Sequence, residues 1–147
     1  MSENKNRDLL PFLVILESVE KILVYAKGFQ TAESFLRSDD QMQFNATLLL
    51  LSNIGEYITR ISEETRSAYS TFPWKKIRGL RNRIAHDYTG IDYEMVFRIV
   101  RNDLPPLKNN IEIILKENVE KGAFDKQECV IARSSTFYNH IDFDQFI

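Results

Sequence analysis

Apolar side chains recur every three or four residues along most of this chain, and this spacing constrains the fold more than any other feature. The first such run extends from Leu9 to Lys27 and predicts a helix with one apolar face, which Gly28 ends. A short helix is expected to follow from Thr31 to Leu36, with Thr31 as its N-cap. Helical periodicity therefore dominates the first part of the chain.

The longest predicted helix runs from Gln41 to about Tyr69 and carries a broad apolar stripe. Its later part, Arg60 to Arg66, is charged, and we expect it to be solvated. Gly55 lies inside this helix, where glycine costs roughly 1 kcal/mol relative to alanine. We expect Gly55 to permit the close approach of another backbone.

A further helix is predicted from about Pro73 to Asp87, because proline is tolerated where a helix starts. Ile77, Leu80 and Ile84 would face inward at steps of three and four residues. The segment from Tyr88 to Gly90 is expected to cap the C-terminal end of this helix.

The next predicted helix, Tyr93 to Asn102, has Asp92 as its cap, and helix resumes beyond Asp103–Pro106 to about Glu117. The proline pair leaves either a kink or a break. From residue 118 the pattern is lost, and a strand, a docked short helix and a mobile tail all fit the sequence. We expect an all-α, up-and-down bundle of four to five main helices over residues 1–117, with residues 118–147 as an extension and not a separate domain.

Composition narrows the classes of function. The 147 residues fit one domain, and a net charge of −2 means that any contact with RNA must be local. The single cysteine, Cys129, allows no internal disulfide, which suits a cytoplasmic protein. Two histidines and one cysteine are too few for a typical zinc site, and we expect no metal. Neither a signal peptide nor an apolar run long enough to span a membrane is found.

The segment Trp74–Gly90 is unusual because it gathers basic residues in an acidic protein and holds one of the two histidines. On a straight helix Asn82 and His86 would share a face, since they are four residues apart. Arg81 and His86 would be separated by roughly 140° around the axis. A second copy of the segment would close this gap, so we expect a homodimer with the site between the protomers.

This set of side chains suits RNA cleavage by the ribose 2′-OH. Neutral His86 can take the 2′-OH proton, and Arg81 can stabilise the charge that grows on the phosphate. Asn82 and Tyr88 can orient the reacting groups, with Lys75 and Arg78 as further RNA contacts. The products would be a 2′,3′-cyclic phosphate and a 5′-hydroxyl.

Each of these features also has a purely structural explanation. An Arg-x-x-x-x-His spacing is common, and a basic cluster can be a solvated helix face. A histidine near a helix end can interact with the helix dipole. Two other classes of function therefore stay open: a non-catalytic bundle that binds nucleotides or RNA, and a protein-interaction scaffold.

The segment Pro73–Asp92 resembles the HepT-like toxins of the HEPN superfamily, through their Arg-Asn-x-x-x-His-x-Tyr motif with a tryptophan before it and Gly-Ile-Asp after it. Asn53–Glu56 resembles the family's Ile-Gly-Glu sequence, and Asp103–Leu107 resembles its Asp-Leu-Pro-x-Leu sequence. The likeness extends from Asp8 to about Leu115. Tyr57 departs from the small residue more usual there.

The resemblance implies a dimeric, metal-independent endoribonuclease toxin without a cofactor. Arg81 and His86 would be its catalytic pair, supported by Asn82 and Tyr88. The family's antitoxin is a small nucleotidyltransferase thought to transfer AMP onto the motif tyrosine, here Tyr88. Glu56 is expected on a buried face, where it would pair with an arginine of the motif helix instead of acting in catalysis.

Overall fold

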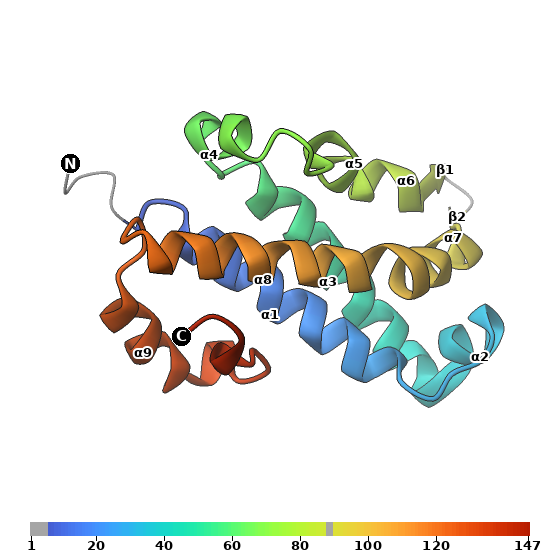
Figure 1. Cartoon of the computed structure of the whole chain (residues 1–147). Helices are drawn as coiled ribbons and strands as arrows, with labels where there is room; N and C mark the ends of the chain where they lie inside the picture. Colours follow the sequence, from blue (N-terminus) through green and yellow to red (C-terminus); the bar gives the residue numbers. More distant parts are fainter. Residues whose placement is uncertain (1–5, 88–89) are drawn as a thin grey trace.

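Three long helices form the centre of the molecule: α1 (Leu9–Ala26), α3 (Met42–Ile58) and α8 (Leu104–Glu120). The structure is a computed structural model that describes residues 6–87 and 90–147, with the backbone alone for residues 85–87. Figure 1 shows α1 and α3 crossing behind α8, with α4, α5 and α6 along one side of α8 and α9 on the other. The predicted all-α bundle is confirmed.

Shorter elements complete the chain. They are α2 (Ala32–Arg37), α4 (Glu63–Ala68), α5 (Trp74–Arg78), α6 (Leu80–Ile84), α7 (Tyr93–Arg98), α9 (Lys126–Arg133), the strands β1 (Ala85–Asp87) and β2 (Gly90–Ile91), a π-helical turn (Ile99–Asp103) and the 3-10 turns Ser38–Gln41, Thr136–Tyr138 and Phe143–Gln145. As predicted, the Thr31 side chain caps α2 by accepting a hydrogen bond from the Ser34 N–H at 3.1 Å.

The core is continuous and lies where the long helices cross. Phe12, Ile15, Ile54 and Ile111 are completely buried in it. Burying one such side chain contributes about 1.5–3 kcal/mol, so these contacts supply much of the driving force for folding. The predicted apolar face of the motif segment also joins this core, because Ile77, Leu80 and Ile84 are buried.

Gly55 lies where α3 meets α5. A Cβ atom built on Gly55 would lie 3.5 Å from the carbonyl oxygen of Arg78 and 3.7 Å from that of Ile77. The two backbones are therefore in close approach, as the sequence predicted.

The long helix predicted from Gln41 to Tyr69 is wrong as one helix. Helix α3 ends at Ile58, and α4 starts afresh at Glu63 with Ser62 as its N-cap. The buried carboxylate of Asp8 accepts hydrogen bonds from the Ser62 N–H (2.8 Å) and hydroxyl (2.6 Å) and from the Thr65 hydroxyl (2.5 Å). These bonds satisfy polar groups at the helix start and hold α4 against the N-terminal end of α1.

The motif helix predicted to reach Asp87 is also shorter than expected. Helices α5 and α6 follow one another through Gly79, and α6 ends at Ile84. The Asp92 N–H donates to the Ile84 carbonyl at 3.3 Å and so occupies an acceptor that a continuing helix would use. Strand β1 then pairs with β2 in an antiparallel ladder. Of the predicted cap from Tyr88 to Gly90, the first two residues lie outside the described part.

Of the two alternatives for the proline pair after Asp103, a kink or a break, the break is wrong because helix continues through this segment. Helix α7, capped as predicted by Asp92 (Oδ1 to the Met95 N–H, 3.0 Å), passes through the π-helical turn directly into α8. Pro105 and Pro106 lie in the first turn of α8, where missing N–H groups cost little.

The C-terminal extension is a docked helical segment, which was one of three alternatives left open. Phe124, Cys129 and Phe143 are buried in the same core cluster as the long helices. His140 accounts for part of the attachment: its N–H donates to Glu17 Oε1 and its Nδ1 lies against Glu17 Oε2, both at 2.7 Å. No helix in the described ranges is long and apolar enough to cross a membrane.

Candidate active site

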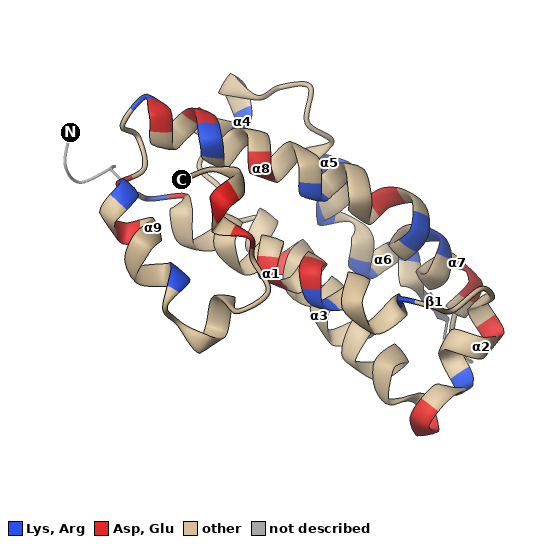
Figure 2. Cartoon of the chain, turned by 60° about the horizontal axis from the view of Figure 1, so that its bottom comes forward, with Lys and Arg blue, Asp and Glu red and all other residues tan. Residues whose placement is uncertain are grey.

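Lysines and arginines of the motif segment lie along α5 and α6, and Figure 2 colours them blue on the ribbon. Lys75, Arg78, Arg81 and Asn82 are all exposed. Their apolar neighbours anchor the two short helices in the core, so these polar side chains are directed toward solvent from a fixed backbone. A basic face is what the sequence predicted for this segment.

Asp103 neutralises part of this basic face. The Asp103 carboxylate forms two ion pairs: Oδ2 lies 3.0 Å from Nη1 of Arg83, and Oδ1 lies 3.4 Å from Nζ of Lys76. Its side chain is only 17 % exposed, so the two cations link α5 and α6 to the π-helical turn. Among the side chains that the structure describes, no carboxylate lies within ion-pair distance of Lys75, Arg78 or Arg81. Within the motif segment, these three cations are therefore available to an anionic ligand.

The two other motif residues lie at the edge of what is described. His86 is on β1, where only the backbone is described, and Tyr88 lies outside the described residues. The prediction that Asn82 and His86 share a helical face assumed helix through residue 86, and it fails because α6 ends at Ile84. For the same reason, the angle of roughly 140° expected between Arg81 and His86 on a straight helix does not apply. Only Arg81 and Asn82 keep the predicted helical setting.

Glu56 does not lie on a buried face, which corrects the sequence-based expectation. Its side chain is 64 % exposed and pairs with Arg60 of the following turn at 3.9 Å, not with an arginine of α5 or α6. The neighbouring Gly55 takes the position against α5. Glu56, one residue on, therefore points outward.

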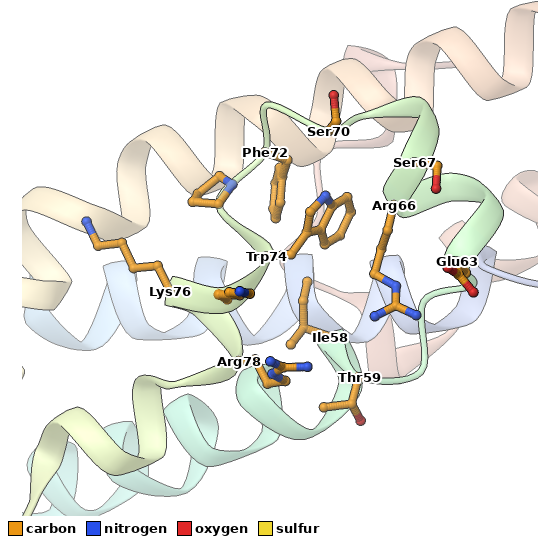
Figure 3. A pocket seen from close by; sticks show the side chains of 12 residues that line it. Ile58, Thr59, Glu63, Arg66, Ser67, Ser70, Phe72, Trp74, Lys76 and Arg78 are labelled. Atoms are coloured by element: carbon orange, nitrogen blue, oxygen red, sulfur yellow. The ribbon is translucent and has the colours of Figure 1, made fainter.

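Beside the motif lies an open pocket of about 610 Å³, shown in Figure 3 and here called the α4–α5 pocket. Its floor comes from the C-terminal end of α3, and its sides come from α4, α5 and the loop between them. Its lining includes two aromatic side chains, one carboxylate and four basic side chains: Phe72, Trp74, Glu63, Arg66, Lys75, Lys76 and Arg78. Two predicted RNA contacts, Lys75 and Arg78, thus meet in one hollow, whereas Arg81 and Asn82 lie outside its lining.

The aromatic wall of the pocket is held by hydrogen bonds. The Trp74 indole N–H donates to the Tyr69 carbonyl at 2.9 Å, and its ring packs on Phe72 with centroids 4.1 Å apart. The Tyr69 hydroxyl donates to Glu117 at 2.7 Å and accepts from Asn118 at 3.1 Å. Burial, with the nearby Glu117 carboxylate, raises the pKa of Tyr69 to about 12. The wall itself, Phe72 and Trp74, carries no ionisable group, and Trp74 is held by its hydrogen bond to the Tyr69 carbonyl.

Arg66 is the pocket residue that the sequence did not indicate. It was expected to be solvated within a long helix, but it is half-buried on α4, and its Nε atom is buried without a hydrogen-bond partner among the described residues. The missed signal was Ser62 followed by two glutamates, a typical helix start. This start separates α4 from α3, and it places Arg66 on a short helix that lines the pocket together with α5.

The described residues contain no group of three or more His, Cys, Asp or Glu side chains that could hold a metal ion.

Comparison with known proteins defines the class. The family model described as "Ribonuclease HepT-like" matches residues 15–114. The chain is 35% identical over 109 residues to a Methanocaldococcus jannaschii protein named "Putative RNase MJ1380", an alignment that covers 74% of this chain and 97% of the relative. It is 29% identical over 102 residues to the "Probable ribonuclease HepT" of Thermococcus cleftensis, covering 69% and 90%. No solved structure gives a significant match.

This chain therefore belongs to the HepT-like ribonuclease family. The match contains α5, α6 and the whole Arg-Asn-x-x-x-His-x-Tyr motif. It ends before α9, so the docked extension is an addition to the matched region.

Proposed function

We propose that this protein is a metal-independent endoribonuclease that cleaves RNA through attack of the ribose 2′-OH on the adjacent phosphate. His86 accepts the 2′-OH proton, and Arg81 stabilises the negative charge on the phosphate oxygens in the transition state. Asn82 and Tyr88 orient the phosphate and the attacking hydroxyl. The bond to the 5′-oxygen of the next nucleotide breaks, which leaves a 2′,3′-cyclic phosphate and a 5′-hydroxyl.

One observation carries this proposal: the complete Arg81-Asn82-x-x-x-His86-x-Tyr88 set lies inside the region that matches the HepT-like ribonuclease family. Two features of the site support it. Arg81 is exposed on a helix anchored in the core, and no described carboxylate neutralises it. The ion pairs of Asp103 fix the backbone from which Arg81 projects.

The active unit is a homodimer in this proposal. Arg81 and Asn82 are exposed and lie outside the α4–α5 pocket, whereas phosphoryl-transfer sites work best when groups converge from several sides. A second copy facing the first would enclose the RNA between two motif segments. Sedimentation velocity should then show a dimer, and a monomer that still cleaves RNA would contradict this part.

In the cell the protein acts as the toxin of a toxin–antitoxin pair. A nucleotidyltransferase antitoxin transfers AMP onto the hydroxyl of Tyr88, with release of pyrophosphate from ATP. The adduct adds negative charge beside a basic face and blocks access to RNA. The support is the position of Tyr88 in the motif, two residues after His86.

Expression in cells tests the toxin role. Wild type should arrest growth, and His86→Ala should not, at equal soluble levels. A non-catalytic RNA-binding bundle or an interaction scaffold predicts instead that the two chains behave alike. Equal harmlessness of both, together with no RNA cleavage in vitro, would reject the toxin.

Intact mass tests the modification. Co-expression with a cognate nucleotidyltransferase should raise the mass of the wild-type chain by one or more AMP units. Tyr88→Phe should abolish the increase, whereas the control Tyr93→Phe, a half-buried tyrosine of α7, should keep it. An AMP adduct on another residue would contradict the assignment.

A further inference from the structure

The α4–α5 pocket has an excess of positive charge that the fold does not use. Four basic residues line it, Arg66, Lys75, Lys76 and Arg78, against a single carboxylate, Glu63. Only Lys76 has an ion-pair partner among the described residues, and that partner, Asp103, lies outside the pocket lining. Cations gathered in a hollow repel one another unless an anion joins them.

The two arginines reach the pocket from different elements. Figure 3 shows the guanidinium group of Arg66, from α4, and that of Arg78, from α5, both near Ile58 and Thr59 at the end of α3. The Nε atom of Arg66 is buried with no hydrogen-bond partner in the described structure. A partly desolvated guanidinium without a counter-ion is unfavourable, and its planar fork matches phosphate oxygens.

Both arginines project from backbone that is fixed before any ligand arrives. Helix α4 is held by the hydrogen bonds from Ser62 and Thr65 to Asp8, and the loop to α5 by the bond from Trp74 to the Tyr69 carbonyl. Binding would therefore cost little ordering of the site, which favours affinity.

The pocket lies next to the motif along the same helical path. Gly79 interrupts the helix between α5 and α6 but is bonded on both sides: its N–H donates to the Lys75 carbonyl, and its carbonyl accepts from the Arg83 N–H, both at 3.0 Å. Arg78 is the last residue of α5 and Arg81 is the second residue of α6, so the two arginines lie three residues apart on consecutive helices. An extended chain of phosphates held at Arg81 would thus have its next phosphate near Arg78.

We propose that the α4–α5 pocket binds an RNA backbone phosphate next to the cleaved one, with Arg66 and Arg78 as its ligands. The proposal rests on the proposed function, because the RNA passes from this pocket to Arg81. It assigns a binding role to α4, which lies outside the catalytic motif. Arg66 binds substrate here and does not take part in bond cleavage.

RNA binding tests the pocket without requiring cleavage. Fluorescence anisotropy of a labelled single-stranded RNA would be followed with full-length His86→Ala protein as a function of salt. Adding Arg66→Gln should weaken binding about 5- to 20-fold and reduce the slope of log K against log salt by about 0.7, the value for one lost phosphate contact. Arg78→Gln should do the same. The control Arg133→Gln, on α9 across the molecule, should change neither.

Cleavage separates this proposal from the function on which it rests. In the His86-containing enzyme, Arg66→Gln should raise KM for a long RNA by a larger factor than it raises KM for a dinucleotide, because a dinucleotide has no second phosphate. If wild type binds RNA through Arg66 but never cleaves it, the proposed function fails and the pocket assignment stands. If wild type cleaves RNA and both arginine variants bind with unchanged affinity and slope, the pocket assignment is overturned.

A free nucleotide is the other source of a phosphate for this pocket. AMP would be added as competitor to the RNA complex. If the pocket is a phosphate site used by RNA, AMP should displace the RNA only weakly, at millimolar concentration. This competition should disappear in Arg66→Gln. Tight AMP binding that depends on Arg66, combined with RNA binding that does not, would overturn the assignment.

Discussion

At the scale of single residues, Gly55 tests the packing that places the motif. A methyl group there would meet the Arg78 carbonyl at 3.5 Å, an ordinary contact distance. Gly55→Ala should therefore be neutral or stabilise the protein by up to about 1 kcal/mol, because alanine favours helix. Gly55→Val should destabilise it by about 1–3 kcal/mol, because its extra methyls press on α5. Urea unfolding would measure both, and equal stabilities would contradict the close approach.

Tyr69 gives a pH-dependent prediction. Its pKa is raised from 10.0 to about 12, mainly by burial and then by Glu117, so the folded state favours the protonated phenol. The stability from this group is complete below pH 10 and is lost as the pH rises toward 12. Tyr69→Phe should cost about 1–2 kcal/mol at pH 8, and the difference from wild type should shrink above pH 10. A difference that stays constant to pH 11.5 would refute this.

At the scale of elements, Asp103 links α5 and α6 to the helix pair α7–α8. Asp103→Asn removes the charge that pairs with Lys76 and Arg83, and should cost about 1 kcal/mol in thermal or urea unfolding. The matched control is Glu33→Gln, whose pair with Arg37 is mostly exposed and should matter by less than about 0.5 kcal/mol. Equal losses in the two variants would show that Asp103 does not hold the motif helices.

Element type was predictable from sequence, whereas element ends were not. The periodicity of Leu9–Lys27 and the caps at Thr31 and Asp92 depend on local chemistry, so α1, α2 and α7 begin where expected. The local signal for the start of α4, Ser62 followed by two glutamates, was missed, and Asp8 reinforces that start from 54 residues away. The end of α6 depends on a contact outside the helix, because the Asp92 N–H takes the Ile84 carbonyl.

The candidate site divides in the same way. Lys75 and Arg78 were recognised because they belong to a basic run. The exposure of such a run can be predicted from its charge alone, without knowledge of the packing of the helices. Arg66 lies outside that run and joins the site only because α4 folds back beside α5. Glu56 was misplaced because its face is decided by Gly55, the residue that packs against α5.

At the scale of the whole molecule, the extension after α8 is part of the core. Phe143 is 2 % exposed and Phe137 is 81 % exposed, which makes them a matched pair on one segment. Phe143→Ala should destabilise the protein by about 3–5 kcal/mol, and Phe137→Ala by less than about 0.5 kcal/mol. The fluorescence of Trp74, the single tryptophan, reports the unfolding of the helical bundle, because Trp74 lies on α5 and far from the extension in sequence. An unchanged Trp74 transition in Phe143→Ala would mean that the extension unfolds separately.

The proposed roles of Arg81 and His86 in metal-independent RNA cleavage can be tested directly. The most direct measurement is cleavage of an end-labelled RNA in EDTA, with the product ends identified by mass. Wild type and the control Arg133→Gln should release a 2′,3′-cyclic phosphate and a 5′-hydroxyl at equal rates. His86→Ala should be slower by about 10²–10⁴-fold, the usual contribution of a general base. Cleavage that EDTA abolishes, or that His86→Ala retains in full, would contradict the account.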